Sequence, residues 1–173
     1  MSRRDRLLGL SGEALLDECE MDRFRASGPG GQKRNKTESA VRLRHLATGI
    51  QAHASESRSQ HENRVVALRR LRLRIALELR EPVAIQAYAT PAELTSWLIR
   101  PGRPTRRERE AGAYLRAVAA LLDVFVAVEG VMAEAAEVLG VTTNLLSKRI
   151  AADEALARKV NELRAARDLR PLR

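Results

Sequence analysis

The 173-residue sequence predicts an α+β fold, in which a short, mainly antiparallel sheet and one long helix precede an all-α region. Polar and apolar residues alternate over 41–54, apolar residues recur at helical spacing over 65–79, and alanine-rich helical sequence follows Pro82. We therefore expect three parts, which are a first domain at 1–82, a linker with a short helix at 83–104, and an α-helical domain at 105–173.

The first part of the chain carries signals for a helix, a strand and a hairpin. Ser11 is a good helix cap, which predicts a short helix through Cys19, and residues 20–25 have the composition of a strand. Residues 26–37 are dense in turn formers. A β-hairpin follows, with arms at 41–44 and 50–54 and a turn at 47–49.

The long helix is predicted from one apolar stripe. Ser59 followed by Glu62 fits a capping box. The stripe ends before Pro82, which closes the helix. Its members are Val65, Leu68, Leu71, Ile75 and Leu79, and Arg69, Arg70, Arg72 and Arg74 lie largely off it.

Composition indicates a polyanionic partner. The net charge is +9 and aromatic residues make up only 3% of the chain, so backbone phosphates are a better target than stacked bases. Residues 23–74 hold 13 Lys or Arg against 3 Glu, which places the basic surface in the first domain. The single Cys19 forms no internal disulfide and there is no membrane-length apolar run, so we expect a cytoplasmic protein.

Two stretches together resemble a known family. These are GPGGQKRNKTESAVRLRHLATG at 28–49 and SRSQHENRVVALRRLRLRI at 57–75. In this order they look like the peptidyl-hydrolase domain shared by bacterial class I peptide chain release factors and the smaller ribosome-rescue hydrolases. The resemblance covers roughly residues 10–81.

The resemblance implies that Gly30, Gly31 and Gln32 are the catalytic residues. In the family this loop enters the peptidyl transferase centre of the large ribosomal subunit and promotes attack of water on the ester of peptidyl-tRNA. Glycines let the main chain approach a sugar without side-chain collision. A backbone N–H at Gln32 can stabilise the developing oxyanion while the side-chain amide positions a water, so no ionisable residue is required.

Ribosomal RNA and peptidyl-tRNA are the partners that the resemblance implies, with no cofactor, no metal, no membrane and a monomeric state. The predicted RNA-binding residues are Arg25, Lys33, Arg34, Lys36, Arg42, Arg44, Arg69 and Arg70. Lys33 and Arg34 stand where the family more often has histidine and valine, so the loop's RNA contacts are expected to differ.

Three alternatives accompany this interpretation. The first is a nucleic-acid-binding adaptor that docks on ribosomal RNA without hydrolysis. The second is a conventional hydrolase using Ser27 or Ser39 with His45. The third is a metal site at the three histidines, which their spacing disfavours. We expect instead that His45 and His53 pair or face solvent, and that His61 caps the long helix or contacts RNA.

Codon recognition is not expected, because no segment resembles the codon-reading domains of full release factors. The chain end also differs from the lysine-rich tail of rescue hydrolases, so the way a stalled ribosome is sensed is left open. The activity that the resemblance implies is codon-independent release, as in ribosome rescue.

The second domain carries a capping box and a helix-turn-helix pattern. Thr105 and Glu108 predict the start of a long helix to about Val128. Small, glycine and apolar residues then follow at helix-turn-helix spacing, as Ala136, Gly140 and Leu146. The functional interpretation gives the second helix nucleic-acid contacts at Thr143, Asn144, Lys148 and Arg149, and the alternative is a plain packing module.

Overall fold

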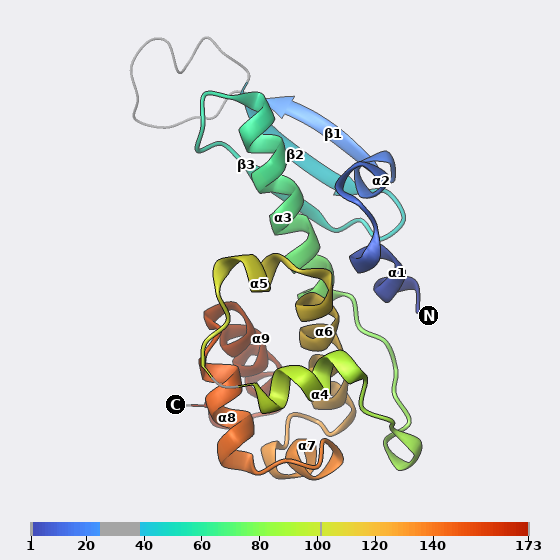
Figure 1. Ribbon diagram of the computed structural model, residues 1–173, viewed down its shortest axis with the longest axis vertical. Coiled ribbons are helices and arrows are strands. Elements are labelled where there is room, and N and C mark those ends of the chain that lie inside the picture. Colours follow the sequence, from blue (N-terminus) through green and yellow to red (C-terminus); the bar gives the residue numbers. More distant parts are fainter. Residues whose placement is uncertain (1, 25–38, 101, 173) are drawn as a thin grey trace. The chain divides into compact units, whose positions relative to one another are not determined.

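The computed structural model describes residues 2–24, 39–100 and 102–172, and the chain divides into two compact units, Met1–Ile75 and Ala76–Arg173. A three-stranded antiparallel sheet lies in the first unit, and in the part of the second unit that the structure describes the regular elements are all helical (Figure 1). The predicted α+β class is confirmed at this level.

The sheet has the strand order β1-β2-β3 and is formed by β1 (Cys19–Phe24), β2 (Ala40–His45) and β3 (Gln51–Ala54). Side chains of β2 alternate as predicted over residues 41–44, because Val41 and Leu43 are fully buried while Arg42 and Arg44 are exposed. The hairpin turn depends on Gly49, whose φ of 71° is in the region that favours glycine.

Helix α3 (Gln60–Glu78) lies across one face of this sheet (Figure 1). The predicted stripe is only partly correct, since Leu71 and Ile75 are fully buried but Val65, Leu68 and Leu79 are half-buried. The helix buries a different row of side chains against the sheet, in which successive members are four residues apart. Its fully buried members are Asn63, Ala67, Leu71 and Ile75.

Two short helices precede the sheet, α1 (Arg3–Gly9) and α2 (Gly12–Asp17). The predicted cap is present, because the Ser11 hydroxyl accepts a hydrogen bond from the backbone N–H of Ala14 at 3.1 Å. The fully buried Leu7, Leu8 and Leu15 add these helices to the core of the first unit.

The second unit is built around α6 (Gly112–Ala127), whose residues 117–125 are all buried. Leu94, Trp97 and Leu98 of α4 are also buried, so part of the segment predicted as a linker belongs to this core. The other helices of this unit are η1 (Ile85–Ala87), α4 (Ala92–Ile99), α5 (Arg106–Glu110), α7 (Met132–Val138), α8 (Thr143–Ala151) and α9 (Glu154–Ala165).

The prediction of one long helix from Thr105 to Val128 is wrong. The capping box of Thr105 and Glu108 is present, but α5 ends after five residues because Ala111 has an extended backbone with ψ 138°. The chain changes direction there, so that the arginines of α5 stay at the surface while α6 enters the core. Tyr114, in the first turn of α6, is thereby buried and donates a hydrogen bond to Asp153 at 2.7 Å.

Candidate functional site

The predicted catalytic residues follow β1 and precede β2 in the chain. Gly30, Gly31 and Gln32 lie outside the described residues, as do Arg25, Lys33, Arg34 and Lys36. The strands on either side are paired, with Phe24 opposite Ala40. The two ends of the segment that carries the GGQ motif therefore meet at one end of the sheet.

Asn63 joins the second of these ends to the connection between β3 and α3. Its Nδ2 donates to the carbonyl oxygens of Ser39 and Ser57, both at 2.7 Å, and its Oδ1 accepts from the Ser57 N–H at 3.0 Å. The side chain is fully buried, so its polar atoms cannot hydrogen-bond to bulk water instead. The sequence prediction missed this residue because it searched the helix for apolar positions. The signal was its spacing, four residues before Ala67 on the buried row.

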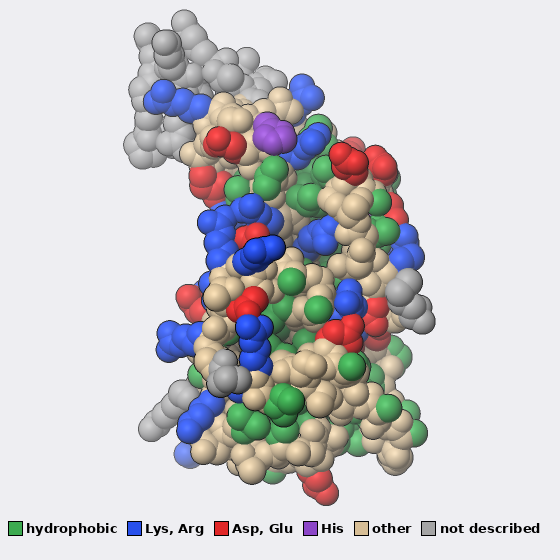
Figure 2. Space-filling model, in the orientation of Figure 1, with side chains coloured by type: hydrophobic (Ala, Val, Ile, Leu, Met, Phe, Trp, Pro, Cys, Tyr) green, Lys and Arg blue, Asp and Glu red, His purple; other side chains and the backbone are tan. Residues whose placement is uncertain are grey.

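The predicted RNA contacts Arg42 and Arg44 lie on the exposed face of the sheet. Both are paired across β1, Arg42 with Asp22 at 3.2 Å and Arg44 with Glu20 at 3.6 Å. The strand register places these residues directly opposite one another. On the side of the molecule drawn in Figure 2, acidic and basic side chains likewise lie next to each other. The two arginines therefore add little net positive charge to this face.

The arginines of α3 hold the helix to its neighbours. Arg70 donates to the carbonyl of His53 at 2.8 Å and forms an ion pair with Glu56. Arg74 donates to the carbonyl of Gln51 on the same strand. Arg69, the other predicted RNA contact on this helix, is half-buried. Phosphate binding by Arg69 and Arg70 stays a prediction, and for Arg70 it would compete with these bonds.

Arg58 is a basic residue that the site prediction did not include. It is exposed in the connection that Asn63 holds beside Ser39, and within the described part of the chain it forms no ion pair. The sequence signal was its place in the SRSQHENR motif. Arg58 is therefore a better candidate for a phosphate contact than the paired arginines of the sheet.

The expectation that His45 pairs with His53 or faces solvent is wrong. His45 is fully buried, with Nδ1 2.8 Å from the Thr48 hydroxyl and Nε2 3.2 Å from the Glu18 carboxylate. Both ring nitrogens are thus occupied within the first unit, which leaves none for activating Ser39. Ser27, the other proposed nucleophile, lies outside the described residues. His53 and His61 are both exposed. The side chain that caps α3 is that of Ser59, not of His61.

Glu18 is expected to link the stability of the first unit to pH. Hydrogen bonds from Arg6 at 2.7 and 2.9 Å, followed by the bond with His45, lower the pKa of its carboxyl to about 2. A lowered folded-state pKa stabilises the protein above the unfolded pKa of about 4.5 and loses that effect as pH falls.

We therefore expect Glu18→Gln to flatten the dependence of the melting temperature on pH between about pH 4.5 and 2. Thermal melts of both proteins across this range measure it. Glu13→Gln is the control, because that side chain is exposed on α2. A Glu18→Gln protein that loses stability in acid as steeply as the wild type would contradict the expectation.

The predicted helix-turn-helix contacts lie on two sides of α8. Thr143, Asn144 and Lys148 are exposed. Arg149 instead donates from Nε to the carbonyl of Leu98 at 2.9 Å and from Nη1 to that of Gly102 at 3.0 Å. It thereby caps the end of α4, where helix carbonyls lack partners.

The comparisons with known proteins place the chain in a family. The RF-1 domain model matches residues 14–110, so the protein belongs to the RF-1 domain family. This match reaches past α3 through α4 and α5, beyond the segment that suggested the resemblance.

The curated relatives are peptide chain release factors. Peptide chain release factor 2 of Campylobacter concisus (strain 13826) is 36% identical over 123 residues, which is 66% of this chain and 34% of the relative. Peptide chain release factor 2 of Variovorax paradoxus (strain S110) is 61% identical over 58 residues, 34% of this chain and 16% of the relative. Peptide chain release factor 1 of Acidiphilium cryptum (strain JF-5) is 52% identical over 67 residues, 39% of this chain and 19% of the relative. The chain thus spans about a third or less of the length of these relatives.

Two further properties concern the described residues only. They include no helix long and apolar enough to cross a membrane. They also bring together no group of three or more His, Cys, Asp or Glu side chains that would hold a metal ion.

Proposed function

We propose that the protein hydrolyses the peptidyl-tRNA ester on ribosomes, with Gly30, Gly31 and Gln32 as the catalytic residues. The observation that carries the proposal is the GGQ motif within an RF-1 domain match, in the segment between two paired strands. The release factors that the chain resembles give the class of reaction. Two of the motif's three residues are glycines, which permit close approach of the main chain to a substrate.

The active site in this proposal is completed by the ribosome. The backbone N–H at Gln32 stabilises the charge that develops on the ester carbonyl, and its side-chain amide positions the water. This division of work agrees with the described part of the chain, in which the buried His45 has both ring nitrogens engaged. Without a ribosome the protein should have negligible activity.

The proposal includes codon independence. The chain matches only one segment of its relatives. The proposal therefore takes from them only the hydrolytic step. Peptide release from stalled ribosomes, measured with a stop codon, a sense codon or no mRNA in the A site, tests this step. We expect release in all three, and fastest release with the A site empty. Release only with a stop codon would refute codon independence, and no release from any ribosome would favour the adaptor function.

The cations around Gln32 are proposed to bind ribosomal RNA phosphates. Replacing Lys33, Arg34 and Lys36 by alanine should weaken ribosome binding and lower the slope of log affinity against log salt by about two to three units. Sedimentation at several salt concentrations measures both.

A matched control replaces three cations of the second unit, Arg158, Lys159 and Arg170. Two of these are already paired with carboxylates, and the net charge changes equally. If both triple variants lower the slope equally, general charge and not the loop determines binding.

A further inference from the structure

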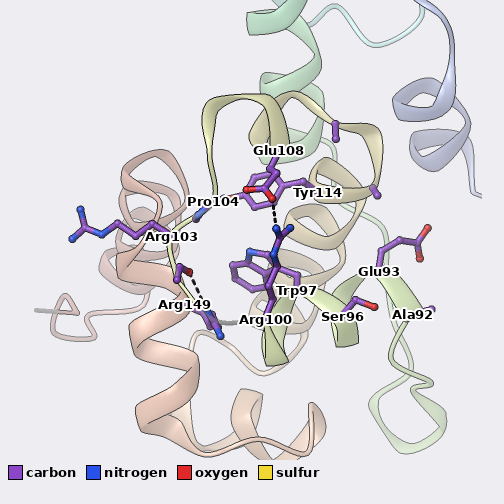
Figure 3. A pocket seen from close by; sticks show the side chains of 13 residues that line it. Ala92, Glu93, Ser96, Trp97, Arg100, Arg103, Pro104, Glu108, Tyr114 and Arg149 are labelled. Carbon is purple, nitrogen blue, oxygen red and sulfur yellow. Dashed lines mark hydrogen bonds and ion pairs between the residues drawn. The ribbon is translucent and has the colours of Figure 1, made fainter.

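The second unit contains a pocket of about 380 Å³ between α4, the segment 102–104 and the start of α6 (Figure 3). This volume is within the range of small-molecule sites, about 300–1,000 Å³. Of the predicted site residues that the structure describes, only Arg149 lines it. The pocket therefore requires an explanation separate from hydrolysis.

Two aromatic side chains form part of its wall. The rings of Trp97 and Tyr114 meet edge to face, with centroids 6.2 Å apart and planes at 77°. The Tyr114 hydroxyl is already bonded to Asp153, so the ring contributes apolar surface. Pro104 and Ala113 extend this surface. The interior thus suits a flat apolar group such as an aromatic ring.

The net charge around the pocket is positive, because both of its carboxylates are already paired with arginines. Of its two carboxylates, Glu108 pairs with Arg100, and Glu93 pairs with Arg116 at 3.0 Å. Arg103 and Arg149 form no ion pair with a carboxylate in the described ranges. Arg149 is fixed beside the pocket by its two bonds to backbone carbonyls (Figure 3). The lining of this aromatic slot thus includes two arginines without a carboxylate partner among the described residues.

We propose that this pocket binds an unpaired nucleotide of RNA. The base enters beside Trp97 and Tyr114, and the flanking phosphates contact Arg103 and Arg149. Base and phosphate together match a slot that is apolar inside and cationic outside. An acidic peptide would satisfy the arginines but leave the aromatic surface unfilled. A base stacked in a duplex cannot enter, so the pocket selects single strands. This inference concerns the second unit alone and holds whether or not the protein hydrolyses peptidyl-tRNA.

Trp97 makes the site observable, because it is the only tryptophan in the chain. RNA bound elsewhere, for example at the basic residues 23–74, should leave its fluorescence nearly unchanged. We expect a 12-nucleotide single-stranded oligoadenylate to quench this fluorescence in a saturable way in the full-length protein. Duplex RNA of equal length, AMP and a polyglutamate peptide should each bind at this site at least tenfold more weakly.

Two kinds of variant distinguish binding in the pocket from attraction by surface charge. Ala113→Phe fills the slot from an exposed position without changing charge, and Arg103→Glu reverses a charge at its border. Each should weaken the quenching interaction at least tenfold. Arg158→Glu is the control, because it makes the same charge change on α9 away from the pocket and should stay within twofold. Ser96→Phe fills the slot from α4, in case Ala113→Phe fails to fold by circular dichroism.

Several outcomes would overturn the proposal. Equal quenching by duplex RNA or by the peptide would exclude recognition of an unpaired base. Equal affinity for AMP would assign the pocket to a free mononucleotide. Unchanged binding by folded Ala113→Phe and Ser96→Phe proteins would show that only surface charge attracts the RNA.

Discussion

Replacing Gln32 by alanine is expected to slow peptide release more than tenfold while ribosome binding changes little. A tenfold loss corresponds to about 1.4 kcal/mol of transition-state stabilisation. Under the proposed function, the substitution removes the side-chain amide that would position water but keeps the backbone N–H and the neighbouring cations Lys33, Arg34 and Lys36. Single-turnover release at saturating protein, with affinity measured separately by sedimentation, distinguishes the two effects.

Gln51→Ala is the matched control for this substitution. Gln51 is exposed on β3, and the bond it accepts from Arg74 uses its backbone carbonyl, which alanine retains. It should therefore release peptide at the wild-type rate. Release by Gln32→Ala at the wild-type rate would remove the catalytic role of Gln32. Absence of release from the wild type would instead support the adaptor function.

The sheet and its hairpin could be predicted because their signals are local. Alternation in β2 and β3 and the glycine turn between them depend only on neighbouring residues, and the structure has them where the pattern indicates. The end of α5 is different. Ala111 favours helix and a single glycine such as Gly112 is tolerated within a helical pattern. The change of direction depends on burying Tyr114 against Asp153, 39 residues away. Tertiary contacts of this kind override local helix preference.

The basic residues show the limit of reading a site from composition. Thirteen Lys and Arg residues in 23–74 predict a polyanion partner, but composition does not say which of them are already paired. Arg42, Arg44 and Arg70 each have an acidic partner that lies 14 to 24 residues away in the sequence, brought close by strand pairing or by the packing of α3. His45 was misjudged for the same reason, because its partner Glu18 lies 27 residues away in the sequence. Which charges are available for RNA is a property of the fold.

Asn63→Ala is expected to destabilise the first unit by about 3 kcal/mol, the largest stability effect predicted for this protein. The change leaves two carbonyls and one N–H without their partner, and each unsatisfied buried polar group costs about 1–3 kcal/mol. For a unit of this size the melting temperature should fall by more than about 10 °C. Thermal and urea unfolding followed by circular dichroism measure the loss.

Asn161→Ala is the control for the loss of an asparagine. Among the described residues, the Asn161 side-chain amide bonds only Leu172, near the end of the described chain, at 2.7 and 3.4 Å, so its loss should cost less than about 1 kcal/mol. Equal destabilisation by both variants would contradict a special role for Asn63.

Asn63→Asp shows which of the three bonds matters. Aspartate keeps the acceptor for the Ser57 N–H but, when ionised, donates to neither carbonyl and is charged in a fully buried position. It should therefore be at least as damaging as alanine at neutral pH. Burial raises the folded-state pKa of such a carboxyl, so stability relative to the wild type should be partly regained as pH falls and the protonated acid donates to one carbonyl. A pH-independent difference would show that the donations to Ser39 and Ser57 do not hold this junction. If the proposed function is correct, Asn63→Ala should also slow release at temperatures where it remains folded, because Ser39 lies at the end of the segment that carries Gln32.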